Sequence, residues 1–166
     1  MGFSGAAFRL QVSQGDWCPS ACDATLGFEL TAPMLKAVGY DLESYHNDSN
    51  FIFSGKNRMK NAIVKSIDQG IPLIAINLDG EMDWGVITGY DNGGKSLLFR
   101  RYNAADDTYV QAKAWPYCCM ELFNKDTGAS DPRVNILASF KLAVEIANTN
   151  IKDGYTIGFK AYDFSL

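Results

Sequence analysis

Few side chains in this chain could take part in covalent chemistry: it contains four cysteines and one histidine. Cys18 lies in a turn-rich loop beside Trp17, where a thiol could face a cleft and act as a nucleophile if a base removed its proton. His46, the one histidine, lies in a polar stretch and is a candidate for that base. Free cysteines are usually small buried apolar residues, and a lone surface imidazole usually has no function.

The cysteines also admit a structural interpretation. Cys18 and Cys22 are separated by three residues, and Cys118 and Cys119 are adjacent. Four thiolates could hold zinc, although adjacent cysteines rarely fit one tetrahedron. Four cysteines at these spacings do not suggest the disulfide framework of a small secreted protein, so we interpret them as thiols and expect no metal and no cofactor.

A carboxylate and a guanidinium form the second candidate group. Asp83 and Arg100 fall on two strands joined by a short hairpin, which could bring them together as a salt bridge or as a polar anchor in a ligand cleft. Trp17 and Trp84 could line the same cleft, although each could instead pack in the core.

The hydrophobic pattern predicts the elements that must position these side chains. Residues 5–12 alternate apolar and polar side chains, which is typical of a half-buried strand. A short helix is expected over residues 28–38, interrupted or begun at Pro33 and ended at Gly39. Residues 56–69 carry Met59, Ile63 and Ile67 four apart, which predicts a longer helix.

A sheet follows this helix in the sequence. We expect strands over residues 72–78, 84–90, 96–102 and 108–115. The first is a continuous apolar run typical of a central strand, and Asp91-Asn92-Gly93-Gly94 predicts a hairpin between the second and third. A second long helix is expected over residues 133–149. Strands and helices in this order predict an α+β fold with an antiparallel sheet packed against helices.

Length and composition limit the classes of function. With 166 residues, of which 47% are hydrophobic, the chain is expected to form a single domain with a substantial core. A formal net charge of −4 argues against nucleic acid and anionic lipid as partners. The apolar runs are far shorter than the roughly 20 residues of a membrane span, and the start carries no signal-peptide pattern, so we expect a cytoplasmic location.

Two segments carry a resemblance to a known family. Gly70-Ile71-Pro72-Leu73-Ile74-Ala75 and Asp83-Trp84-Gly85-Val86-Ile87-Thr88-Gly89-Tyr90-Asp91 resemble a pattern of bacterial papain-like cysteine peptidases of the bacteriocin-processing type, relatives of the butirosin-biosynthesis acyltransferase. Met1 to Arg9 and the residues around Trp17 resemble uncharacterised bacterial proteins of the same superfamily. The resemblance implies a papain-like fold over residues 1–166.

The same resemblance implies a catalytic set that is incomplete here. The family uses a cysteine thiolate activated by histidine and oriented by an Asp or Asn, and Asp83 stands where the histidine belongs. A carboxylate beside a thiol raises the pKa of the thiol instead of lowering it. Arg100 and Arg101 stand near the place of the orienting acid, and the nucleophile helix would precede Met1. The resemblance thus implies a fragment that lacks this helix, or a shortened form.

Two functions follow from these observations. The first is an amide or thioester hydrolase or acyltransferase of bacterial metabolism, whose main catalytic residues lie outside the chain, with Cys18 and Asp83 as the candidates within it. The second is a non-catalytic module that binds a peptide or small molecule through Asp83, Trp17, Trp84 and Arg100. A zinc-stabilised structural domain is a third interpretation.

Overall fold

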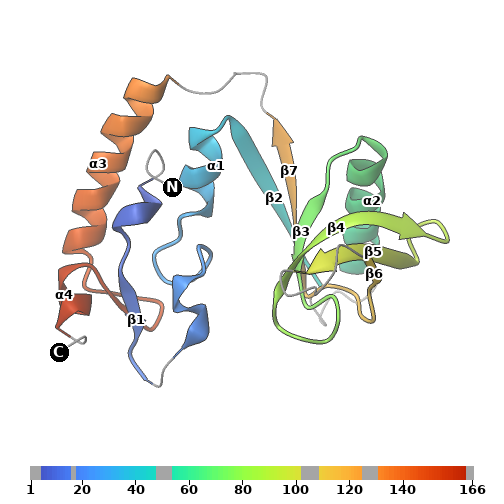
Figure 1. Cartoon of the computed structure of the whole chain (residues 1–166), viewed down its shortest axis with the longest axis horizontal. Helices are drawn as coiled ribbons and strands as arrows, with labels where there is room; N and C mark the ends of the chain where they lie inside the picture. Colours follow the sequence, from blue (N-terminus) through green and yellow to red (C-terminus); the bar gives the residue numbers. More distant parts are fainter. Residues whose placement is uncertain (1–4, 16–17, 48–53, 102–108, 125–130, 164–166) are drawn as a thin grey trace. The chain divides into compact units, whose positions relative to one another are not determined.

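The computed structural model describes residues 5–15, 18–47, 54–101, 109–124 and 131–163, in which the chain forms two compact units. Unit 1 consists of Met1–Asp41 and Asn124–Leu166, and unit 2 consists of Leu42–Phe123 (Figure 1). The length and composition of the chain predict a single domain. The division arises because segments near the two ends of the sequence pair with each other, while the segment between them builds its own sheet and core. Both units mix helices with antiparallel strands, so the α+β class is confirmed.

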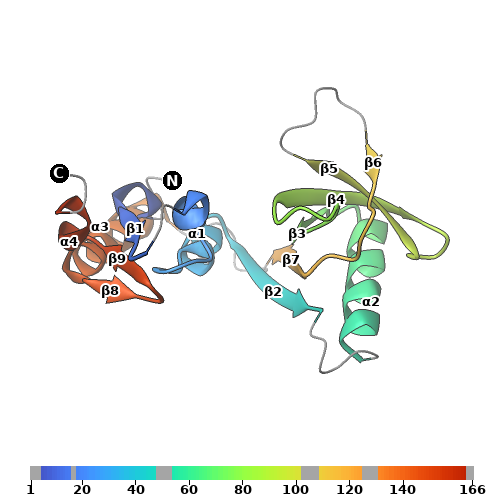
Figure 2. The ribbon, with the colours of Figure 1, turned by 90° about the horizontal axis from the view of Figure 1, so that it is seen from below.

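Unit 1 contains a small antiparallel sheet with the strand order β1-β9-β8 (Figure 2). Its strands are β1 (Gln11–Ser13), β8 (Ile151–Lys152) and β9 (Tyr155–Ile157). Its α-helices are α1 (Thr31–Ala37), α3 (Pro132–Asn148) and α4 (Phe159–Tyr162), and two 3-10 helices, Ala6–Phe8 and Pro19–Cys22, precede them. Phe28, Leu30, Ile146 and Ile157 form its buried core.

The strand predicted over residues 5–12 is wrong for most of its length. Gly5 adopts a φ of 75° and starts the 3-10 helix Ala6–Phe8, so extended pairing begins only at Gln11. Arg9 shows the physical reason, because its guanidinium donates hydrogen bonds to the carbonyl oxygens of the loop that follows. This polar side chain is therefore engaged inside the unit, which the alternation of apolar residues does not reveal.

Arg9 and Gln11 together hold the loop before α1. The Arg9 guanidinium nitrogens lie 2.6–3.2 Å from four backbone oxygens, those of Cys22, Asp23, Leu26 and Phe28. The Gln11 amide nitrogen donates to Ala21 O at 2.7 Å and to Leu26 O at 3.1 Å, and its amide oxygen accepts from Phe28 N at 3.2 Å. Burial lowers the pKa of Arg9, although nearby carboxylates partly oppose that effect. Two side chains therefore satisfy several backbone groups of this loop.

The helix predicted over residues 133–149 is confirmed as α3. Asp131 caps its start, since the carboxylate accepts a hydrogen bond from Arg133 N at 2.9 Å. The buried residues of this helix are Asn135, Ser139 and Ile146. Asn135 donates from its side chain to Ala37 O at 2.9 Å, which joins α3 to the end of α1. The most apolar stripe of the helix, which includes Leu137 and Phe140, is exposed.

Unit 2 is a six-stranded sheet with one helix along one of its faces (Figures 1 and 2). The strand order is β2-β7-β3-β4-β5-β6. The strands are β2 (Tyr40–His46), β3 (Leu73–Ile76), β4 (Trp84–Asp91), β5 (Ser96–Arg101), β6 (Val110–Gln111) and β7 (Cys118–Asn124), and the helix is α2 (Ser54–Asp68). Two predictions are thereby confirmed: β3 is a central strand, and α2 is the helix that Met59, Ile63 and Ile67 indicate.

The hairpin predicted between β4 and β5 is confirmed in detail. Asn92, Gly93 and Gly94 all have positive φ values, of 51°, 62° and 79°. These conformations are easy for glycine and tolerable for asparagine. The register then pairs Asp91 with Ser96 and Ile87 with Phe99, with an irregularity between Ile87 and Gly89. Of the fourth strand, predicted over residues 108–115, the structure forms β6 at Val110–Gln111.

Candidate functional site

The sheet of unit 2 has two faces with different roles. Cross-strand partners share a face, so the register sorts the side chains. One face carries Leu73, Ala75, Ile87, Phe99 and Cys119, all at most 1% exposed, and packs on Met59 and Ile63 of α2. This face is the core of the unit.

The opposite face carries two rows of side chains that cross neighbouring strands. In the first row, Cys118 of β7 pairs with Ile76 of β3, and Ile76 pairs with Trp84 of β4. In the second row, the pairs run from Met120 through Ile74 and Val86 to Arg100. We call this surface the outer face. Both rows are mostly apolar; the first ends at Trp84 on β4 and the second at the Arg100 guanidinium on β5.

A hollow of about 550 Å³ lies on this outer face. That volume falls in the range of small-molecule sites, roughly 300–1,000 Å³. Its lining consists of Ile74, Asp83, Trp84, Gly85, Val86, Thr88, Arg100 and Arg101. The predicted cleft residues Asp83, Trp84 and Arg100 are therefore brought together around one hollow.

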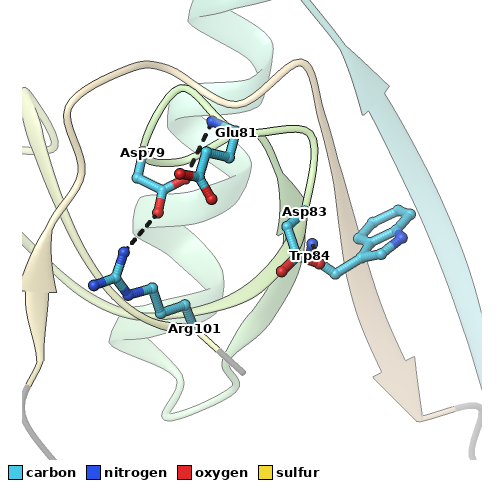
Figure 3. Close-up of polar contacts among 5 residues, drawn as sticks. All are labelled: Asp79, Glu81, Asp83, Trp84 and Arg101. Atoms are coloured by element: carbon cyan, nitrogen blue, oxygen red, sulfur yellow. Dashed lines mark hydrogen bonds and ion pairs between the residues drawn. The ribbon is translucent and has the colours of Figure 1, made fainter. Parts of the chain in front are cut away.

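The loop between β3 and β4 positions the polar rim of the hollow (Figure 3). Asp83 Oδ1 accepts a hydrogen bond from its neighbour Trp84 N at 2.8 Å, and Asp83 O accepts from Asn77 N at 3.1 Å. Asn77 has a φ of 67°, which turns the chain out of β3. The Asp83 carboxylate thus stabilises the entry into β4, and the Trp84 indole points away from the acidic loop.

The two arginines at the end of β5 have different partners. Arg101 Nη1 lies 3.1 Å from Asp79 Oδ2 in a partly exposed ion pair, also drawn in Figure 3. The guanidinium carbon of Arg100 lies 5.6 Å from the centre of the Tyr109 ring, a cation–π distance. An ion pair at this rim therefore joins Arg101 to Asp79, whereas the sequence suggests their neighbours Arg100 and Asp83, the latter four residues after Asp79.

Cys18, the predicted nucleophile, lies in unit 1, whereas Asp83 and the hollow belong to unit 2. Its sulfur lies 3.6 Å from the hydroxyl oxygen of Tyr155. The hydrogen bond with Cys18 raises the pKa of Tyr155 above its ordinary value, so this phenol stays protonated at neutral pH. A protonated phenol cannot take a thiol proton, and the group beside Cys18 is therefore a poor base.

His46 lies instead beside another cysteine. Its Nε2 is 3.9 Å from Cys118 Sγ, across the neighbouring strands β2 and β7. Each of the two residues is a separate candidate in the sequence, and their contact was not predicted. Their spacing gives no sign of it, because they are 72 positions apart and are joined by the pairing of β2 with β7.

The four-cysteine zinc site is not formed. Cys118 and Cys119 are consecutive in β7, so their side chains point to opposite faces of the sheet, and Cys119 is fully buried in the core. Burial raises the pKa of Cys119 to about 12, which keeps its thiol protonated. Among the residues that the structure describes, no cluster of three or more His, Cys, Asp or Glu side chains could hold a metal ion.

Trp17, the remaining cleft candidate, lies outside the described residues. Within the described part of the chain, no helix combines the length and the apolar character that a bilayer crossing needs. Comparison with family models, with curated proteins and with solved structures finds no match to this chain.

Proposed function

We propose that the chain is a binding module, and that the outer face of unit 2 holds a peptide or small molecule with an apolar body and an anionic group. The observation that carries this proposal is the hollow of about 550 Å³ over two apolar cross-strand rows, one of which ends at Trp84 and the other at Arg100. A mostly apolar lining with few polar groups is typical of ligand sites.

The charges at the hollow select the class of ligand. Two arginines, Arg100 and Arg101, lie at one edge, and Asp79 already pairs with Arg101. A guanidinium binds a carboxylate through two parallel hydrogen bonds, which favours an anionic group at this edge. Trp84 and Val86 offer the apolar body a surface, and Val86 is 38% exposed.

The resemblance to papain-like peptidases belongs to the same proposal. A papain-like protein that has lost its activating histidine, with Asp83 in its place, would keep a cleft for peptides while losing the ordinary peptidase mechanism. The alternative, an amide or thioester hydrolase or acyltransferase, needs a thiol and a base that lie together. Among the described residues, Cys118 and His46 do so.

Calorimetric titration with a succinyl-tetrapeptide amide tests the binding proposal. This probe carries one carboxylate, an apolar body and no reactive group. We expect saturable binding that Arg100→Gln weakens at least tenfold, because hydrogen bonds to a charged group contribute about 1.5–3 kcal/mol. Trp84→Ala is expected to weaken binding as well.

Arg58→Gln is the matched control, because Arg58 lies on α2 and is 73% exposed in its side chain. We expect it to leave the affinity unchanged. The acetyl analogue of the probe, which lacks the carboxylate, should bind weakly and with little dependence on Arg100. Equal affinities for both probes, or an Arg100→Gln variant that binds as well as the wild type, would overturn the proposal.

A further inference from the structure

The lone histidine of the chain is held against a thiol. His46 Nε2 lies 3.9 Å from Cys118 Sγ, within reach of a hydrogen bond to sulfur. The Tyr117 ring meets the imidazole edge-on, with ring centres 6.3 Å apart and an interplanar angle of 82°. Asn47 N donates to Tyr117 O at 2.9 Å, which fastens the end of β2 to the start of β7. The imidazole is therefore positioned by contacts on both strands.

Cys118 lies on the same face of the sheet as the hollow. It pairs with Ile76, which pairs in turn with Trp84. Strands lie about 4.8 Å apart, so Cys118 is roughly 10 Å from the Trp84 position. Arg100 lies three strands across the sheet and two residues along it, in the neighbouring row, which places it about 16 Å from Cys118. An extended tetrapeptide, about 13 Å long at roughly 3.3 Å per residue, spans this distance once a succinyl group is added at its end. A ligand anchored at Arg100 could therefore reach the thiol across the outer face.

The thiol needs a base before it can react. Cys118 is 6% exposed, and burial raises its pKa, so at neutral pH it carries its proton. The carboxylate of Glu121 lies three positions along β7 and therefore on the opposite face of the sheet, where it accepts a hydrogen bond from the Tyr45 hydroxyl at 2.9 Å. The imidazole of His46 is the side chain in contact with this thiol that commonly acts as a general base in proteins.

We propose that Cys118 accepts an acyl group from a thioester bound on the outer face, with His46 as the proton acceptor. This inference rests on the proposed function, since the same face must first bind the ligand. The Cys118 sulfur attacks the carbonyl carbon, and its proton moves to His46 Nε2. The carbon–sulfur bond of the thioester then breaks, the leaving thiolate takes the proton from His46, and S-acyl-Cys118 remains. The substrate class is a peptidyl or acyl thioester with a carboxylate about 16 Å from its reacting carbonyl.

A succinyl-tetrapeptide thiobenzyl ester has this layout and serves as the probe. The full chain is incubated with it near pH 7, thiol release is followed with time, and the acylated residue is located by peptide mass mapping. We expect acylation of Cys118 at a higher rate than that of Cys22, even though Cys22 is exposed. Cys118→Ala is expected to abolish the thiol release that accompanies acylation of Cys118.

The role of the base is tested separately. His46→Gln removes an exposed side chain, and we expect it to slow acylation of Cys118 at least tenfold, since general base catalysis contributes about 10²–10⁴-fold. The affinity for the unreactive succinyl-tetrapeptide amide should not change. Cys22→Ser, with its fold checked by circular dichroism, is the matched control and should leave the Cys118 rate unaltered.

The possible failures are distinguishable. If the amide binds in an Arg100-dependent way but the thioester acylates Cys18 or Cys22 instead of Cys118, this inference is overturned and the binding function stands. A Cys118 rate that is equal in the wild type and in His46→Gln also overturns it. If the amide does not bind at all, both proposals fail.

Discussion

Replacing Arg9 by methionine should destabilise unit 1 strongly. The guanidinium donates to four backbone oxygens at 2.6–3.2 Å, and these oxygens belong to the loop that leads into α1. Methionine fills a similar volume but donates nothing. Hydrogen bonds to a charged group contribute about 1.5–3 kcal/mol each, and desolvation of the guanidinium offsets much of that total. We expect the free energy of unfolding to fall by about 3 kcal/mol.

Denaturant unfolding followed by far-ultraviolet circular dichroism measures this loss. Hydrogen exchange at Leu30 N, which donates to Ala24 O at 2.8 Å, should also become faster, because the loop loses its anchor. Arg9→Lys keeps the charge but cannot reach four acceptors at once, so it should lose most of the same stability. Arg133→Met, the same change at an exposed position of α3, should cost less than about 0.5 kcal/mol. The reasoning is refuted if Arg9→Met and Arg133→Met have equal effects.

Two further predictions concern pH and backbone strain. Burial raises the pKa of Cys119 from 9.0 to about 12, so the unfolded state loses the thiol proton first and the free energy of unfolding falls as the pH rises from 9 to 12. Cys119→Ala should show a smaller fall over this interval in denaturant unfolding. An equal fall in the variant would show that Cys119 is not its source. Gly158→Ala should destabilise the fold by more than about 2 kcal/mol, because φ is 64° and the new Cβ would overlap Ile146 O. Gly154→Ala should cost about 1 kcal/mol, because φ is 81° but the space around the residue is open. Thermal denaturation of both glycine variants checks that order.

Elements defined by local patterns could be predicted from the sequence. Met59, Ile63 and Ile67 recur at helical spacing and bury one face of α2, while Asn92 and Gly93 allow the positive φ values of the hairpin. In each case the residues that form the element also carry its signal. The apolar run of β3 likewise predicted a central strand, which β4 and β7 flank.

Elements that depend on distant partners could not be predicted. The strands β2, β7, β8 and β9 carry weak alternation of their own, and each is defined by pairing with another segment. The interpretation of residues 5–12 as a strand was wrong because Arg9 serves loop carbonyls up to 19 positions away. Sequence spacing contains no information about such contacts.

The residues of the candidate site could be predicted in part, whereas the contacts between them could not. Asp83, Trp84 and Arg100 were predicted to share a cleft because they flank one hairpin, and all three line the hollow. The ion pair between Asp79 and Arg101 was not predicted, because it joins the loop before β4 to the end of β5. The proximity of His46 to Cys118 arises from strand pairing across 72 positions.

The most direct test of the account is to map where a ligand binds. Amide chemical shifts of the isotope-labelled chain are recorded by nuclear magnetic resonance while the succinyl-tetrapeptide amide is added. The account predicts that the largest changes fall on β3, β4 and β5, around Ile74, Val86 and Arg100, with small changes on α2 behind the sheet. Changes centred on α2 or on unit 1, or no changes at a saturating concentration, would contradict it.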